Sequence, residues 1–163
     1  AAIPRGSFYQ YFEDKDDIFY FLLEEYSSTL NQRFRSILVK ENGNLIPTFI
    51  ESYRMMLESI QNKEFRYFFK NAFLNMNYRI ENTISKSISE ERRNSRFAEV
   101  VKLVNTDLLN IQHEEELIHV VKIIRAVTFQ NLIQVFALDL SMEESIKNYT
   151  LDRNLIKNCV YKN

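Results

Sequence analysis

The sequence predicts an all-α protein, and two observations lead to that fold class. The first is the scarcity of helix breakers: 163 residues contain only two glycines and two prolines, placed where a helix would begin, end or be closely approached. The second is the recurrence of apolar side chains every three or four residues over several long segments, which is the period of an amphipathic helix. Nearly half of the residues are apolar, so the chain can bury a core.

The composition limits the environment and the partners of the chain. A single cysteine, Cys159, excludes an internal disulfide and suits a reducing cytoplasm. No apolar run approaches the length needed to span a membrane and no signal-peptide pattern opens the chain, so we expect a cytoplasmic protein without a membrane partner. The formal net charge of −1 gives the chain as a whole no electrostatic footprint for nucleic acid.

The first long helix is expected over residues 14–40. Asp14 resembles an N-cap, and Asp17 places an acidic group in the first turn, where the helix dipole favours it. Apolar residues then recur every four positions: Ile18, Leu22, Tyr26, Leu30, Phe34 and Leu38. Gly43, in the polar segment that follows, suits the left-handed conformation that ends many helices.

Three further helices are expected in the middle of the chain. The first follows Pro47 and buries Ile50, Tyr53, Leu57 and Ile60. After a brief interruption, an aromatic stretch over residues 64–80 places on one face Phe65, Phe69, Phe73 and Met76. A polar loop over residues 85–95 separates it from a short helix over residues 96–109, which buries Phe97, Val100, Val101, Val104 and Leu108.

The penultimate helix, expected over residues 114–138, carries apolar residues on two faces. It begins with three acidic residues, which the helix dipole favours. One face holds Leu117, Val121, Ile124 and Val135, and the other holds Ile118, Ala126, Phe129, Ile133 and Phe136. A helix that is apolar over most of its circumference is buried on both sides, so the second face predicts a partner chain.

The final helix begins with a capping box, in which Ser141 is the cap and Glu144 lies three residues further on. Its apolar residues are Ile146, Tyr149, Leu155 and Ile156. We expect a homodimer through the last two helices, with an interface that includes Ile118, Phe129, Ile133, Phe136, Ile146 and Tyr149.

The sequence contains no pattern that argues for an enzyme. Glu116 and His119 have the i, i+3 spacing of di-iron bundles, but such a site needs a second Glu-x-x-His, and Asn110 stands three residues before His113. No glycine-rich phosphate loop and no Gly-x-Ser-x-Gly motif is present. We therefore expect no catalytic residue, no metal and no cofactor.

The opening segment, IPRGSFYQYFEDKDDIF, resembles the signature of the tetracycline-repressor (TetR) family of bacterial transcription regulators. Pro4 predicts the start of a short helix that ends near Tyr11, and a capped long helix follows, as at the end of a helix-turn-helix. The matching motifs are Gly6-Ser7-Phe8-Tyr9 and Lys15-Asp16-Asp17-Ile18. The resemblance implies a remnant of the DNA-binding domain over residues 1–13 and a helical ligand-binding and dimerisation domain over residues 14–163, with the family's first helices expected before Ala1.

In the family's geometry this segment would lie in the major groove of a double-stranded operator. The resemblance implies base contacts from Arg5, Gly6 and Tyr9, and phosphate contacts from Ser7, Gln10, Tyr11 and Lys15. The segment is locally acidic, so the helices expected upstream would have to supply much of the positive charge.

The aromatic stripe in the middle of the chain has two readings. Most such stripes are core, yet 13 phenylalanines and nine tyrosines are many for this length, and such side chains line sites for small apolar ligands. The resemblance implies an inducer pocket for an apolar or aromatic molecule, for which the expected residues are Tyr53, Phe69, Phe73 and Met76.

The function expected is therefore that of a ligand-responsive regulator, a repressor that leaves its operator when the inducer binds. The alternative is a dimeric helical sensor or scaffold that binds no DNA.

Overall fold

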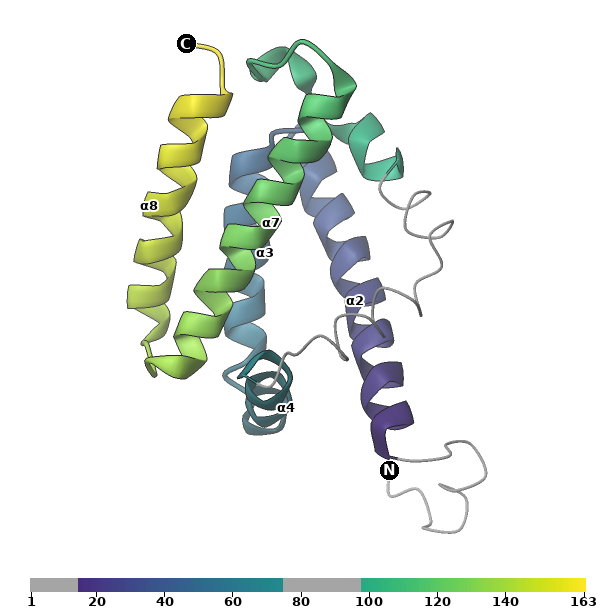
Figure 1. Ribbon diagram of the computed structural model, residues 1–163, viewed down its shortest axis with the longest axis vertical. Coiled ribbons are helices and arrows are strands. Elements are labelled where there is room, and N and C mark those ends of the chain that lie inside the picture. The colour runs from purple at the N-terminus through teal and green to yellow at the C-terminus, as the bar shows by residue number, and fades with distance from the viewer. Residues whose placement is uncertain (1–14, 75–97) are drawn as a thin grey trace.

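The computed structural model describes residues 15–74 and 98–163 (Figure 1). These stretches form α2 (Lys15–Lys40), α3 (Leu45–Ser59), α4 (Lys63–Leu74), the 3-10 helix η1 (Thr106–Leu108), α7 (Glu114–Ala137) and α8 (Met142–Val160). A further helical segment covers residues 98–103. Within the described stretches, β structure is limited to one isolated bridge between Leu109 and Tyr161. The prediction of an all-α fold is confirmed.

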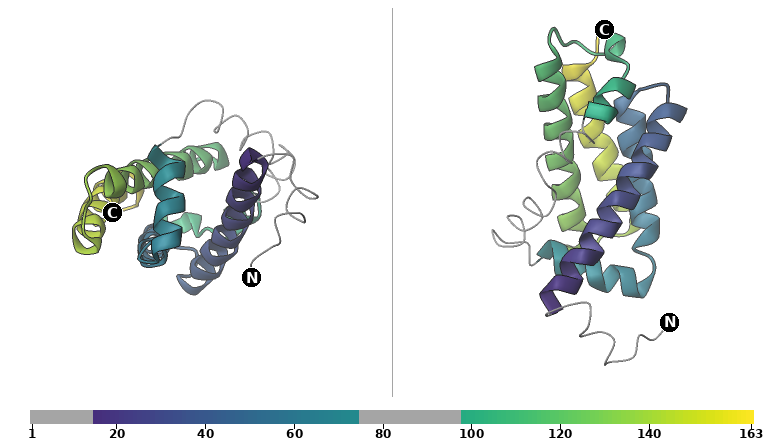
Figure 2. Two further views of the ribbon diagram at one scale, coloured as in Figure 1. Left: turned by 90° about the horizontal axis from the view of Figure 1, so that it is seen from below. Right: turned by 90° about the vertical axis from the view of Figure 1, so that its right-hand side faces the viewer.

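The helices form a bundle around α3. This helix packs against α2 on one side and against α8 on the other, while α7 packs against α8 and α4 (Figure 1). α4 lies across the end of the bundle at which α2 begins (Figure 2). The C-terminus lies at the opposite end of the bundle (Figure 1). α2 runs from the α4 end towards that opposite end.

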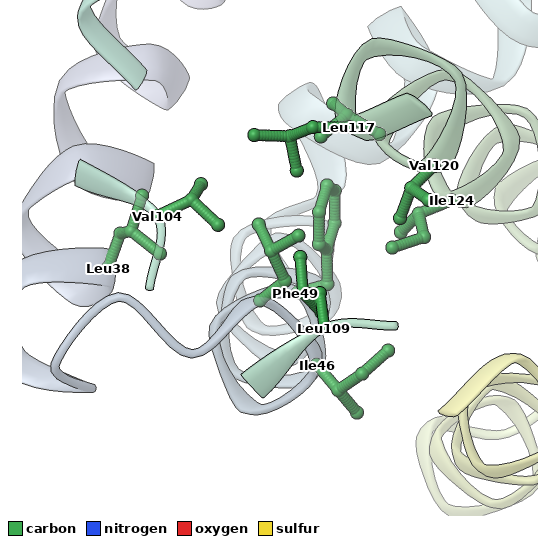
Figure 3. Packing of buried hydrophobic residues seen from close by; sticks show 10 residues of the cluster. Leu38, Ile46, Phe49, Val104, Leu109, Leu117, Val120 and Ile124 are labelled. Atoms are coloured by element: carbon green, nitrogen blue, oxygen red, sulfur yellow. The ribbon is translucent and has the colours of Figure 1, made fainter. Parts of the chain in front are cut away.

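Two clusters of buried side chains hold the bundle together. The first core cluster lies towards the C-terminal end of α2 and consists of Leu38, Leu45, Ile46, Phe49, Val104, Leu109, Leu117, Val120, Val121 and Ile124. Figure 3 shows Leu38 and Val104 on one side of Phe49, with Val120 and Ile124 on the other. The second core cluster joins α3, α4, α7 and α8 and consists of Tyr53, Leu57, Ile60, Phe69, Leu132, Val135, Phe136 and Tyr149.

The turn between α2 and α3 is built on Gly43. Its φ of +77° is the left-handed conformation expected from the sequence, and its N–H donates to the Leu38 carbonyl at 2.8 Å. A Cβ at this position would lie 2.5 Å from the backbone N of Asn105 and from the carbonyl O of Leu103. Two segments that are distant in sequence can therefore meet here only because residue 43 has no side chain.

The start of α3 differs from the sequence prediction. The helix begins at Leu45, with Asn44 at the N-cap, so Pro47 lies inside the first turn instead of before it. A proline is tolerated there because the first N–H groups of a helix have no intrahelical partner.

The helix predicted over residues 96–109 ends earlier than expected. Its described part ends at Leu103, and after Asn105 the chain forms η1. The Asn105 side chain accepts a hydrogen bond from the Asp107 N–H, and its own N–H donates to the Gly43 carbonyl at 2.9 Å. These bonds end the helix, with the result that Leu109 is buried and Leu108 is only half-buried.

α7 is long and apolar enough to cross a membrane by length and composition alone, contrary to the expectation that no run approached this length. In this fold its side chains contribute instead to the chain's own core, with Leu117, Val120, Val121, Ile124, Asn131, Leu132, Val135 and Phe136 buried. Its polar side includes Lys122 and Arg125, which are exposed.

The final helix is capped as predicted and is then tied back to the bundle. The Ser141 N–H donates to the Glu144 carboxylate at 2.9 Å, and the Glu144 N–H donates to the Ser141 hydroxyl at 3.2 Å. Beyond the helix, the Tyr161 hydroxyl accepts a hydrogen bond from the Ile46 N–H and donates to the Asn44 side chain. The end of α8 is thus fixed to the turn between α2 and α3.

Candidate functional site

The residues expected to contact DNA lie outside the described residues, with one exception. Arg5, Gly6, Ser7, Tyr9, Gln10 and Tyr11 precede residue 15, at which the description begins. Lys15 is the first residue of α2, but its side chain is not among those described. Their contacts with an operator stay predictions.

An aromatic contact joins α2 to α4. The ring of Tyr26, from α2, lies 4.5 Å from the ring of Phe69 and 6.1 Å from that of Phe65, both from α4. Phe69 is buried and packs edge-on against Phe68 at 5.4 Å, while Phe65 is 44% exposed. Among the residues expected to bind a ligand, Phe69 therefore lies where α4 meets the long helix.

A stacked pair of tyrosines joins α3 to α8. The rings of Tyr53 and Tyr149 lie 3.9 Å apart with an interplanar angle of 22°. The Tyr149 hydroxyl is hydrogen-bonded to the Thr128 hydroxyl at 2.6 Å, and burial raises the pKa of Tyr149 to about 12. Burial also raises the pKa of Tyr53, whose hydroxyl has no hydrogen-bond partner among the described residues.

The structure brings two of the four expected ligand-binding residues into one cluster. Tyr53 and Phe69 both belong to the second core cluster. Phe73 lies in α4 but its side chain is outside the described part, and Met76 lies outside the described residues altogether. Whether these four line a common pocket stays a prediction.

Arg153, which contacts this cluster through the ring of Tyr149, is a buried residue that the sequence analysis did not indicate. It is fully buried, and its guanidinium carbon lies 4.4 Å from the centre of the Tyr149 ring. The helical spacing from Tyr149 to Arg153, which places both on one face of α8, was the signal that could have indicated it. A charged side chain on an inward face is unusual enough to suggest a function.

A small crevice lies between α2 and α3, away from the two tyrosines. Its lining is formed by Leu30, Arg33, Phe34, Ile37, Ser52, Met55, Met56 and Ser59. The free volume of about 10 Å³ has room for one water molecule. None of the expected ligand-binding residues takes part in it.

The residues expected at a dimer interface fall into two groups. Ile118 is 43% exposed, and Phe129, Ile133 and Ile146 are half-buried. Phe136 and Tyr149 are instead buried in the second core cluster, because α4 and α3 cover them within the chain.

Three exposed apolar residues accompany the first group. Ile123 on α7 is 55% exposed, and Leu151 and Leu155 on α8 are 56% and 66% exposed. Of the apolar residues that the sequence places in the final helix, Leu155 is thus exposed, while Ile156 packs against the first core cluster.

Glu116 and His113 have a structural role at the start of α7. The carboxylate of Glu116 accepts hydrogen bonds from the N–H groups of Gln112 and His113, at 2.6 and 3.4 Å. These bonds lower the pKa of Glu116. Among the described residues, no group of three or more His, Cys, Asp or Glu could hold a metal ion.

The described residues define an all-α domain, a helical bundle with the long helix α2 and an aromatic core beneath α7 and α8. A family model described as "Tetracyclin repressor-like, C-terminal domain" matches residues 44–160. The chain therefore belongs to the TetR family, and the matched region is the ligand-binding regulatory domain of its transcription regulators. No curated protein and no solved structure matched the chain.

Proposed function

We propose that the protein is a cytoplasmic, homodimeric repressor that leaves its operator when a small, largely apolar or aromatic molecule binds in its helical domain. The proposal rests on family membership and on one contact in particular, the packing of Tyr26 from α2 against Phe69 from α4. Through this contact, a ligand that displaces α4 also displaces the helix that follows the DNA-reading segment.

The two halves of α2 are held differently. Near its C-terminal end, Ile37 and Leu38 are buried, and the Gly43 turn is locked against Asn105. Nearer its start, Leu22 is 45% exposed and Tyr26 is half-buried against α4. A ligand that prefers one position of α4 would therefore shift the equilibrium position of the N-terminal half of α2. In a dimer, this motion would change the spacing of the two recognition helices and their fit to successive major grooves.

A second copy of the chain is the partner that suits the outward faces of α7 and α8. The two helices are antiparallel, and the hydrogen bond between Thr128 and Tyr149 sets their register. Ile123 lies about one and a half helical turns before Thr128 on α7, and Leu155 lies about as far after Tyr149 on α8. Because the two helices are antiparallel, the two exposed side chains lie at nearly the same level along the bundle. Together with Leu151 they would form an apolar surface that a twofold-related copy can cover.

DNA binding is tested with a longer chain that contains the upstream residues of the helix-turn-helix. Selection from a random duplex library should yield a palindromic site, as expected for a symmetric dimer. In that chain, Arg5→Ala should weaken operator binding by about 1–3 kcal/mol and relax the base preference at one position in each half-site. Lys15→Ala should weaken binding to all sequences alike and reduce the salt dependence.

The alternative function has a distinct outcome in the same experiment. A longer chain that dimerises and binds small molecules, but selects no duplex sequence, would be a sensor or scaffold rather than a repressor. An unchanged base preference in Arg5→Ala would instead contradict only the choice of the base-reading face.

A further inference from the structure

Arg153 is a buried cation without a hydrogen-bonding partner. The residue is 0% exposed, and Nε, Nη1 and Nη2 of its guanidinium have no acceptor among the residues that the structure describes. The nearest carboxylate in sequence, that of Asp152, accepts a hydrogen bond from the Asn131 amide at 2.7 Å. Asp152 therefore offsets part of the charge but leaves the donors of Arg153 unused.

A buried arginine without hydrogen-bond acceptors destabilises a fold. A guanidinium stays protonated in proteins, so burial cannot be relieved by loss of the proton. The face of the Tyr149 ring, 4.4 Å from the guanidinium carbon, contributes a cation–π attraction but accepts no conventional hydrogen bond. Buried charges in proteins are nearly always paired, which makes this one an indication of a missing anionic partner.

Tyr53 covers the other face of the Tyr149 ring. Its ring stacks on Tyr149 at 3.9 Å, while the guanidinium carbon of Arg153 lies 4.4 Å from the centre of the same ring, so the two groups lie on opposite sides of Tyr149. The Tyr53 hydroxyl is buried and also has no hydrogen-bond partner among the described residues. The guanidinium of Arg153 is therefore the group here that can bind an anion through two parallel hydrogen bonds.

We propose that Arg153 binds the carboxylate of the effector molecule, whose apolar part packs against the second core cluster. A carboxylate matches the guanidinium fork in a bidentate geometry. The proposal rests on the ligand-binding function proposed above and specifies its chemistry: the effector is an amphiphilic carboxylate, such as an aromatic or medium-chain fatty acid, and not a neutral hydrocarbon.

The test uses the 163-residue chain and requires no DNA, so a failure to find an operator does not affect it. The probes are decanoate and 2-naphthoate, each compared with its uncharged analogue, decanol and methyl 2-naphthoate, and with sodium chloride and inorganic phosphate. Affinities are measured by isothermal titration calorimetry and Tm by differential scanning fluorimetry. We expect at least one carboxylate to bind and to raise Tm, while its uncharged analogue binds at least about tenfold more weakly.

The variants separate recognition from folding. Arg153→Met should weaken carboxylate binding about 10- to 100-fold and, because it removes an unpaired buried charge, should raise Tm of the unliganded chain by a few degrees. Tyr53→Phe keeps the stacked ring and removes only a hydroxyl on the other side of Tyr149, so it should leave the affinity nearly unchanged. Arg54→Met, at the exposed neighbouring position on α3, is the matched control and should change neither quantity.

Several outcomes would overturn the inference. If the uncharged analogues bind as tightly as the carboxylates, and Arg153→Met does not change these affinities, the effector site does not use Arg153. The proposed function would then remain intact. If sodium chloride or inorganic phosphate alone raises Tm as much as the carboxylates do, the site binds inorganic anions. No response to either carboxylate, together with a lower Tm in Arg153→Met, would show that Arg153 is a structural residue held by the Tyr149 ring.

Discussion

At the scale of single residues, Gly43 meets two demands at once. Its φ of +77° costs a residue with a side chain about 1–2 kcal/mol, and a Cβ would also lie 2.5 Å from two backbone atoms of the 103–105 segment. One of those atoms, the Asn105 N, donates a hydrogen bond to the Gly43 carbonyl, so it cannot move away from residue 43 without weakening that bond. The neighbouring Asn42 also has a positive φ, of 53°, but is exposed.

We expect Gly43→Ala to destabilise the chain by at least about 3 kcal/mol, because conformational strain and the clash add. Asn42→Ala is the matched control, since it introduces a similar strain without the clash and should cost about 1 kcal/mol. Urea unfolding followed by circular dichroism measures both values. Equal losses in the two variants would show that the 103–105 segment can yield to a side chain.

Tyr149 makes the stability of the fold sensitive to alkaline pH. Its pKa is about 12 in the folded chain and 10.0 in the reference state, so the folded chain retains a proton that the unfolded chain releases. The corresponding stabilisation is complete below pH 10 and is lost as the pH rises towards 12. Between these pH values the free energy of unfolding falls by up to about 1.4 kcal/mol per pH unit for one such tyrosine. The raised pKa of Tyr53 acts in the same direction.

Tyr149→Phe should therefore make the free energy of unfolding less dependent on pH between pH 10 and 12. It should also lower stability at pH 7 by about 1 kcal/mol, because the hydrogen bond to Thr128 is lost. Chemical denaturation at a series of pH values measures both effects. Tyr67→Phe, at a position that is 74% exposed, should behave like the unmodified chain, and an identical alkaline slope in Tyr149→Phe would contradict the assignment.

At the scale of helices, much of the fold follows from local patterns and the rest depends on long-range contacts. The four-residue recurrence in α2, the left-handed Gly43 and the Ser141 capping box are local signals, and the structure confirms them. The end of the helix near Leu103 depends on a hydrogen bond to Gly43, which lies about 60 residues earlier, and no local pattern contains that information.

The same division applies to the candidate site. Phe69 was indicated by the aromatic stripe and Tyr53 by the apolar face of the preceding helix, and such patterns mark a helix face whatever its neighbour is. Arg153 was missed because a charged residue in an amphipathic pattern is normally assigned to solvent.

The contact between α2 and α4 supports a prediction about coupling between helices. In the longer, DNA-binding chain, Tyr26→Ala should reduce the effect of the ligand on operator affinity about 3- to 30-fold, because the ring that joins α2 to α4 is removed. Ligand affinity should change little. Fluorescence anisotropy with and without ligand measures the effect, and Tyr67→Ala on the exposed side of α4 is the control. Full ligand response in Tyr26→Ala would place the coupling elsewhere.

At the scale of the whole molecule, the proposed dimer places α7 and α8 at its interface. Ile123, Leu151 and Leu155 are each more than half exposed on these two helices, which pack against each other. Exposed apolar side chains that adjoin one another commonly mark an interface. The core positions Phe136 and Tyr149 support this surface from beneath, because they fix α7 to α4 and α8 to α3.

Leu155→Glu should convert the dimer into monomers, because the glutamate would bury a charge without a partner. Sedimentation velocity at several protein concentrations measures the assembly, and circular dichroism checks that the fold is kept. Val39→Glu is the matched control, since Val39 is 60% exposed but lies on α2. A dimer that persists in both Leu155→Glu and Ile123→Glu would place the interface on another face.

The fixed C-terminal end of α2 makes Lys40, the last residue before the Gly43 turn, a natural pivot for the helix. Its 26 residues span about 39 Å, and Tyr26 lies about 21 Å from Lys40. Rotation of the rigid helix about this pivot by an amount that moves Tyr26 by about 1 Å moves Lys15 by about 1.8 Å. A small displacement of Tyr26 would thus be amplified nearly twofold at the start of α2, next to the segment that we expect to contact DNA.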